Sequence, residues 1–298
     1  MPSLTAKAMA VIIGLRGSKK IFSSAEATLA QVAELKIRPQ SCAPPKKLDK
    51  TVDLSVRTVK GWPVYTVTPR GAATERRALY SHGGTWFHEI MPIHWNLIAR
   101  LAASTRTRFT VPIYPLAPAG TAASVIPAIT DMVAELVAEV GAEKVTIMGD
   151  SAGGTITLAV AMQLRARGVP APHQTILICP ALDLAFSDPA IAQIAPRDPW
   201  LAAAGPQAAA QLWRGELPID DPMVSPIHGD LSGLAPITLF SGTHDIVNAD
   251  AQRLVRKAQA ADFPLDYHEA PGLLHVYPLM PTPEANAARA VMERVLKE

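Results

Sequence analysis

The sequence predicts an α/β protein with a mostly parallel sheet and helices on both faces. Short apolar segments rich in β-branched residues alternate with longer helical segments through most of the chain, as in strands joined by crossover helices. Ser151 lies between Gly149 and Gly153, after one such strand and before one such helix. A serine on this turn stands at the carboxyl end of a strand, where parallel sheets build their sites.

Composition narrows the class of protein. The chain has 298 residues, 49% of them hydrophobic and 18% charged, and its net charge of +2 gives no reason to expect a nucleic-acid partner. No apolar run is long enough for a membrane-spanning helix, and the short N-terminal apolar stretch lacks a signal cleavage site. Cys42 and Cys179 lie far apart, so we expect a cytoplasmic protein without a metal or cofactor.

The first 50 residues are expected to form a helical appendage. Helices are predicted around 8–15 and 25–36, with Ser24 as the cap of the second, and a proline-rich linker follows at 38–45. Apolar side chains of the first helix recur at helical spacing: Ala8, Val11, Ile12 and Leu15. We expect this face to pack on the body of the protein. The alternative is weak contact with a membrane surface, because basic residues follow directly.

The body is expected to begin with an antiparallel hairpin at a sheet edge, made by strands at 52–56 and 62–67. The further strands are predicted at 78–81, 109–114, 144–148, 174–179, 237–242 and 265–269. The helices between and after them are predicted at 94–101, 122–140, 155–164 and 249–261, and from 283 onward. Together these segments predict a sheet of eight strands.

Residues 185–226 interrupt the alternation of strands and helices. This stretch is rich in proline and alanine and contains Trp200 and Trp213. Structureless loops of this length are uncommon within a domain, so we expect an inserted segment of short helices. The catalytic body is then expected over 51–184 and 227–298.

Three residues that follow strand ends have the chemistry of a serine nucleophile site. Ser151 needs a base to take its proton, and a histidine suits that task because its pKa lies near neutrality. His275 follows the last strand, and Asp245 follows the strand before it. A carboxylate beside the histidine would set its tautomer. The competing residues are the bases His82, His244 and His268 and the acid Asp183.

Several motifs together resemble one family. They are His82-Gly83-Gly84, Tyr114-Pro115-Leu116-Ala117-Pro118, Gly149-Asp150-Ser151-Ala152-Gly153-Gly154, Asp221-Pro222 with Val224-Ser225-Pro226, Gly242 with Asp245, and His275. From about residue 78 onward, the chain resembles the hormone-sensitive-lipase-like branch of the α/β-hydrolase esterases. The resemblance implies an α/β-hydrolase fold whose lid is built from an N-terminal segment, 1–50, and the insertion at 185–226.

The resemblance also implies roles for individual residues. Ser151 would be the nucleophile, His275 the base and Asp245 the acid. Backbone N–H groups would hold the oxyanion, and the residues implied are Gly83, Gly84 and Ala152. Thr85 departs from the family, which has a third glycine there. Large side chains near these positions are candidates for pocket walls, and each could equally be core: Trp86, Phe87, Trp200, Trp213 and Tyr277.

The implied function is a serine carboxylesterase that hydrolyses short- to medium-chain esters through an acyl-enzyme on Ser151. Its partner would be a small-molecule ester, and a homodimer is left open. Two alternatives remain from the residues alone. Cleavage of lipids or amides would use the same triad, and the same fold also serves as a ligand-binding receptor without catalysis.

Overall fold

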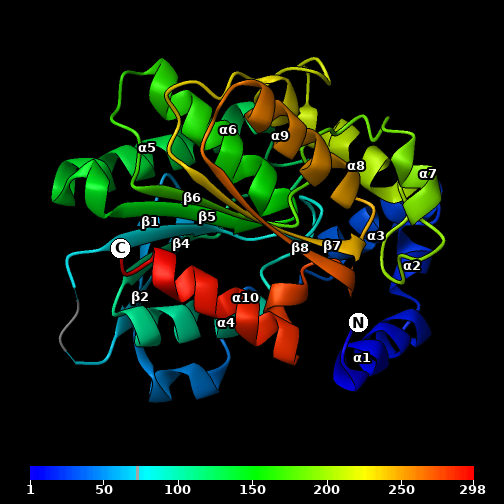
Figure 1. Cartoon of the computed structure of the whole chain (residues 1–298), viewed down its shortest axis with the longest axis horizontal. Coiled ribbons are helices and arrows are strands. Elements are labelled where there is room, and N and C mark those ends of the chain that lie inside the picture. Colours follow the sequence, from blue (N-terminus) through cyan, green and yellow to red (C-terminus); the bar gives the residue numbers. More distant parts are fainter. Residues whose placement is uncertain (72–73) are drawn as a thin grey trace.

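A single twisted sheet forms the centre of the protein (Figure 1). The computed structural model describes residues 1–71 and 74–298. The strands are β1 (Val52–Val59), β2 (Trp62–Pro69), β3 (Arg77–Ser81), β4 (Arg108–Pro112), β5 (Val145–Asp150), β6 (Gln174–Ile178), β7 (Ile237–His244) and β8 (Leu265–Leu274). Their order is β1-β2-β4-β3-β5-β6-β7-β8. Only the pairings of β2 with β1 and β4 are antiparallel, so the predicted mostly parallel sheet with an edge hairpin is confirmed.

Helices cover both faces of the sheet, as predicted. On one face lie α4 (Pro92–Thr105) and α10 (Pro283–Val295), and on the other lie α5 (Ala122–Val140), α6 (Ala152–Ala166) and α9 (Asn248–Ala260) (Figure 1). The short 3-10 helices are η1 (Lys46–Lys50), η2 (Ala142–Lys144), η3 (Pro226–His228) and η4 (Tyr277–Leu279). This arrangement buries β5 completely and aims its carboxyl end at the start of α6.

The last two strands are longer than the sequence pattern indicates. β8 continues through Pro271 and Gly272 to Leu274, whereas the pattern predicted its end near residue 269. A proline is tolerated there because β8 is the outermost strand of the sheet, where an N–H need not have a partner. The extension places His275 one residue beyond β8, and Asp245 likewise follows β7 directly.

Two segments come together at the carboxyl ends of the parallel strands. One contains α2 (Ser18–Ile21) and α3 (Ala25–Ile37), and the other contains α7 (Ala190–Ile194) and α8 (Ala204–Arg214) (Figure 1). α3 packs against α8, and Lys19 Nζ donates to the carbonyl oxygens of Ala195 and Asp198 at 2.7 and 2.6 Å. Residues 185–226 therefore contain the two short helices α7 and α8, and the N-terminal segment is attached to this stretch.

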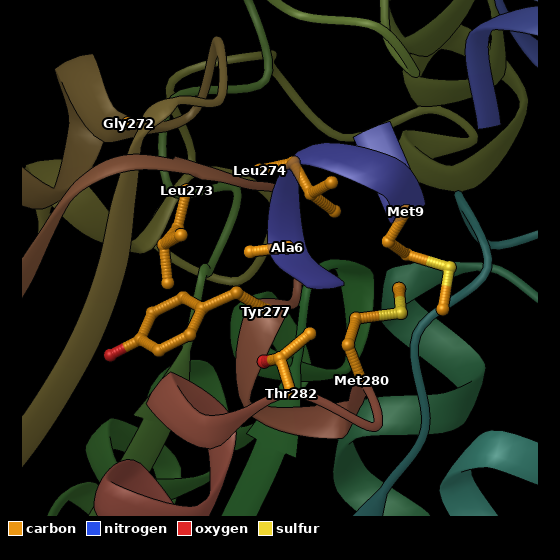
Figure 2. A pocket seen from close by; sticks show the side chains of 8 residues that line it. All are labelled: Ala6, Met9, Gly272, Leu273, Leu274, Tyr277, Met280 and Thr282. Atoms are coloured by element: carbon orange, nitrogen blue, oxygen red, sulfur yellow. The ribbon is translucent and has the colours of Figure 1, made fainter. Parts of the chain in front are cut away.

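The first helix, α1 (Leu4–Leu15), turns a different side to the body than predicted. Ala6 and Ile13 are buried, whereas Val11 and Leu15 are 61% and 83% exposed. Figure 2 shows Ala6 and Met9 facing the chain that follows β8. The prediction that Ala8, Val11, Ile12 and Leu15 pack on the body is wrong. Because α1 is apolar on more than one side, periodicity alone could not select the buried one.

Among the helices of the described chain, none combines the length and the apolar character that crossing a bilayer requires.

Candidate active site

Ser151 occupies a sharp turn between β5 and α6. Its backbone has φ 51° and ψ −120°, a conformation rare for a residue with a side chain, and its N–H donates to Ile178 O at 2.9 Å. The turn is tight on both sides. A Cβ at Gly149 would overlap the carbonyl of Gly153, and a Cβ at Gly153 would overlap the carbonyl of Ser81. The flanking glycines therefore allow the close packing that holds the serine in its strained conformation.

Ser151, His275 and Asp245 form one continuous chain of hydrogen bonds. His275 Nε2 lies 2.9 Å from Ser151 Oγ, and His275 Nδ1 lies 2.8 Å from Asp245 Oδ2. Asp245 is fully buried, and His275 is 4% exposed. The carboxylate requires a proton on Nδ1, so Nε2 is left as the acceptor for the serine hydroxyl. This geometry can activate a serine for attack on a carbonyl.

Two of the alternative residues, His82 and Asp183, are engaged elsewhere. His82 is buried, its Nδ1 lies 2.7 Å from Gly83 O, and its ring stacks on Tyr114 with centroids 4.4 Å apart. Burial, with a contribution from His94, lowers the pKa of His82 to about 4, so this ring stays neutral. The Asp183 carboxylate is paired with Arg253. His82 and Asp183 therefore have structural roles.

We expect the acid limb of the activity to lie above pH 6.5, the ordinary pKa of a histidine. Burial by itself lowers the pKa of His275, but the charge and hydrogen bond of Asp245 outweigh burial and raise it above the ordinary 6.5. The ring accepts a proton only when neutral, so the acid limb of kcat/KM should have its midpoint above pH 6.5. Aryl acetate hydrolysis followed from about pH 5 to 9 measures this limb. A midpoint at or below 6.5 would contradict the prediction.

A second buried histidine–carboxylate pair lies directly beside the serine. Asp150 accepts hydrogen bonds from Tyr80 Oη at 2.6 Å and from Gly83 N at 3.0 Å through Oδ1, while Oδ2 lies 3.2 Å from His94 Nε2. His94 Nδ1 accepts the N–H of Met91 at 2.9 Å, so its proton must be on Nε2. Burial raises the pKa of Asp150, but these donors outweigh burial and hold the pKa below its usual value. No local pattern in the sequence marks this network, although Asp150 lies inside the serine motif.

The network changes the expected set of oxyanion donors. Because the N–H of Gly83 is donated to Asp150, the role implied for Gly83 is wrong. Within the described chain, the N–H groups of Gly84, Thr85 and Ala152 donate no hydrogen bond. Thr85 has φ 52°, a left-handed conformation in the place where the family has glycine. The groups available to bind an anion beside Ser151 are therefore those of Gly84, Thr85 and Ala152.

We expect Asp150→Asn to lower the free energy of unfolding by about 3 kcal/mol, because one buried bond is lost in either amide orientation. If the asparagine turns its oxygen toward Gly83, its NH2 group faces the Nε2–H of His94, and two donors oppose each other. His94 cannot change tautomer while Met91 donates to its Nδ1. With the amide reversed, the NH2 group meets the N–H of Gly83.

Urea unfolding would measure this loss. Asp220→Asn is the matched control, since Asp220 is exposed, and it should change the free energy by less than about 0.5 kcal/mol. Equal unfolding midpoints for the two variants would refute the prediction.

Two cavities meet at Ser151, and Thr85 and Leu201 line both of them. The larger, about 200 Å³, has His275 and, from the N-terminal segment, Phe22 in its wall. The smaller, about 10 Å³, has walls that include Trp86, Ala152 and Phe186. Its volume is about that of one water-sized sphere, whereas the larger cavity holds a sizeable group.

Only two of the five predicted pocket residues lie at these cavities. Trp200 lines the larger one, with its ring centroid 6.0 Å from that of His275 and the planes at 90°. Trp86 lines the smaller one.

The other three predictions are wrong, since Phe87, Trp213 and Tyr277 line neither cavity. Trp213 is fully buried behind Trp86, with centroids 6.3 Å apart, and Phe87 packs on Phe22. Tyr277 faces a small pocket beside α1 (Figure 2).

Asp198 joins the cavity wall at Trp200 and Leu201 to the loop that follows Asp245. It is 1% exposed, and its carboxylate accepts the N–H groups of Trp200 at 2.8 Å, Leu201 at 2.9 Å and Ile246 at 3.0 Å. Burial and the nearby charge of Asp245 raise the pKa of Asp198 to about 6. No sequence signal marked Asp198, because its partner Ile246 lies 48 residues away.

One group of potential metal ligands occurs within residues 1–71 and 74–298. The ligand atoms of Cys179, Asp245 and His275 lie within 4.8 Å of one another. Two members of the group are the hydrogen-bonded pair described above. Burial, with a contribution from the Asp245 charge, raises the pKa of the Cys179 thiol, which keeps it protonated. We therefore interpret the group as part of the hydrogen-bonded site.

Known proteins with similar sequences and structures are hydrolases by name. A family model described as the alpha/beta hydrolase fold matches residues 78–279. A triacylglycerol lipase of Mycobacterium tuberculosis is 31% identical over 80% of this chain, which spans about half (50%) of that lipase. LipR of the same organism, provisionally named an acetyl-hydrolase, is 30% identical over 93% of this chain and 89% of LipR.

A solved structure gives the same result. A Staphylococcus aureus protein provisionally described as an esterase superposes with a TM-score of 0.88 at 25% identity, covering 94% of this chain and 96% of that one. The matched family agrees with the resemblance found in the motifs at residues 82–84 and 149–154. The chain belongs to the α/β-hydrolase fold family, the family of these esterases and lipases.

Proposed function

We propose that the protein is a serine carboxylesterase that cleaves esters of short carboxylic acids through an acyl-enzyme on Ser151. The observation that supports this most is the chain of hydrogen bonds from Asp245 through His275 to Ser151, at 2.8 and 2.9 Å, beside unused backbone N–H groups. The relatives are esterases, lipases and acetyl-hydrolases by name, which favours a carboxylic ester as the substrate class.

In the first half-reaction, Ser151 Oγ attacks the ester carbonyl carbon while its proton passes to His275 Nε2. The carbonyl oxygen becomes an oxyanion, which we expect the N–H groups of Gly84, Thr85 and Ala152 to bind. Each such donor typically lowers the barrier by about 3 kcal/mol. The tetrahedral intermediate then collapses, the bond to the alcohol oxygen breaks, and His275 returns its proton to the departing alcohol.

In the second half-reaction, water takes the place of the alcohol. His275 Nε2 removes a proton from the water as its oxygen attacks the acyl carbon of the Ser151 ester. The same N–H groups hold the second oxyanion. When it collapses, Ser151 Oγ leaves and recovers a proton from His275, the carboxylic acid is released, and the enzyme returns to its starting state.

The position of His275 supports one assignment of the two cavities to the two parts of the substrate. The departing alcohol must lie within reach of His275, and His275 lines the larger cavity but not the smaller. The acyl chain is then left with the small cavity bounded by Trp86 and Phe186, which has room for about one methyl group. We therefore narrow the expected range of acids from short and medium chains to acetyl-like groups.

A series of aryl esters from acetate to dodecanoate tests the function. We expect kcat/KM to be highest for acetate and at least about tenfold lower for hexanoate, because a longer chain would have to displace the cavity walls. Phe186→Ala should move the optimum to longer chains, and Phe263→Ala, a phenylalanine outside both cavities, should leave it in place. No turnover of any ester would refute the esterase, whereas an optimum at dodecanoate would refute only the acetyl preference.

We also propose that residues 1–50 and 185–226 act together as the lid expected from the sequence. Ser18, Ile21 and Phe22 from the first segment and Trp200 and Leu201 from the second all line the larger cavity. The alcohol part and the acid part of the substrate would therefore each contact both the lid and the body.

A further inference from the structure

The outward face of α1 is an exposed apolar stripe. Leu4, Val11 and Leu15 follow one another at helical spacing along one side and are 83%, 61% and 83% exposed. Ile12, beside them, is 44% exposed. In the described chain, five of the eight large apolar side chains counted as exposed lie within the first 15 residues. Single exposed apolar residues are ordinary, but a cluster of this kind indicates an interaction surface.

The stripe is held in a fixed orientation. Ser3 Oγ accepts the N–H of Ala6 at 3.2 Å and caps the helix, and Ser3 N and Oγ both bond to the Glu284 carboxylate of α10. On the opposite side of α1, Ala6 and Met9 face Tyr277 and the rest of the chain after β8 (Figure 2). The apolar stripe is therefore presented outward by a docked helix.

All the charged side chains of residues 1–25 are positive. The first acidic residue of the chain is Glu26, and the residues before it include the exposed Lys7, Arg16 and Lys20. Lys19, the fourth cation, is bound to the carbonyls of Ala195 and Asp198. The Glu284 carboxylate, beside the start of α1, is bonded to Ser3. An exposed apolar stripe with these cations beside it matches the surface of an anionic lipid bilayer, where acyl chains lie beneath negative headgroups.

We propose that the outward face of α1, made by Leu4, Val11, Ile12 and Leu15 with Lys7 and Arg16, docks the protein on an anionic bilayer surface. If two copies of the chain met through this face about a two-fold axis, the same cations would come together. Their repulsion disfavours a second copy of the chain as the partner.

The consequence for catalysis rests on the proposed esterase function. α2, which follows α1 directly, lines the larger cavity through Ser18 and Ile21. Docking through α1 would place the alcohol-side cavity close to the lipid surface. The substrate class favoured there is an acetyl-like ester of an alcohol that partitions into the bilayer.

Vesicle flotation of the full chain tests the docking. We expect binding to phosphatidylcholine vesicles that contain phosphatidylglycerol, little binding to phosphatidylcholine alone, and weakening as salt is added. Leu4→Ser with Leu15→Ser should weaken binding by about tenfold or more. Lys7→Gln with Arg16→Gln should weaken it by about thirtyfold, since each cation near the surface contributes about 1 kcal/mol. Ile37→Ser is the matched control, because Ile37 is 81% exposed at the end of α3 and should have no effect.

Hydrolysis of a soluble aryl acetate, measured on the same proteins, separates this proposal from the esterase function. All these variants should keep wild-type rates on the soluble ester, and Ser151→Ala should bind vesicles as wild type does. Absence of vesicle binding with normal hydrolysis would overturn the docking alone. If the wild-type chain forms a dimer that the Leu4→Ser, Leu15→Ser variant loses, and no vesicle binding occurs, the docking proposal is overturned. The apolar stripe would then bind a second copy of the chain.

Discussion

Ser151→Ala is expected to lower kcat for aryl acetate hydrolysis by about a millionfold, the usual loss when a triad nucleophile is removed. Alanine keeps the backbone of the turn but removes Oγ, the atom that lies 2.9 Å from His275 Nε2. What remains is catalysis by the oxyanion donors and by substrate positioning. Steady-state rates, with enzyme-free hydrolysis subtracted, measure the loss.

Two further observations make this result specific. Ser104→Ala, on the exposed side of α4, should keep the wild-type rate and therefore controls for handling and folding. With an aryl phosphonate ester, Ser151 Oγ should form a bond to phosphorus as the aryl oxide leaves, so that the mass of the phosphonyl group alone is added to the peptide containing Ser151 in wild type and not in Ser151→Ala. Substantial turnover by Ser151→Ala would refute the proposed nucleophile and require a different one.

Asp245→Asn is expected to lower kcat by about ten-thousandfold, mainly through the tautomer of His275. Val247 N donates to Asp245 Oδ1 at 3.1 Å, so an asparagine would keep its oxygen there and turn its NH2 group toward His275 Nδ1. Nδ1 would then have to accept, and the ring proton would move to Nε2. In that state Nε2 cannot take the proton of Ser151.

The matched control is Asp183→Asn, since Asp183 was the other acid compatible with the sequence. Its carboxylate binds Arg253 and the N–H of Ala185, so its loss should reduce stability while leaving kcat within about tenfold. The pH profile adds a second readout, because without the Asp245 charge the pKa of His275 should fall and the acid limb should move to lower pH. If Asp183→Asn were the more damaging change to kcat, the assignment of the acid would be wrong.

The positions of Ser151, Asp245 and His275 could be anticipated from the sequence because each depends on local pattern. Apolar segments locate the parallel strands, and the carboxyl ends of such strands meet at one edge of the sheet. The residue after each strand is then a candidate without any knowledge of side-chain contacts. Even here β8 ended five residues later than predicted, because an edge strand tolerates Pro271.

The sequence could not show which backbone N–H groups near Ser151 are free to bind an anion and which are already bonded within the protein. Whether Gly83 or Thr85 offers its N–H to a substrate depends on where Asp150 turns its carboxylate, and Asp150 is held by Tyr80 and by His94 from α4. Those partners lie 70 and 56 residues away in the chain. The motif at residues 82–84 locates the loop but does not say which of its N–H groups is already used.

The sequence by itself therefore determined the fold class, the edge of the sheet that carries the site and the three residues proposed as the triad. These follow from hydrophobic period and from glycines that a tight turn requires. Only the tertiary structure decided the oxyanion donors, the cavity walls and the exposed side of α1. Those depend on contacts between distant segments, where several similar aromatic or aliphatic side chains compete for burial and packing geometry selects among them.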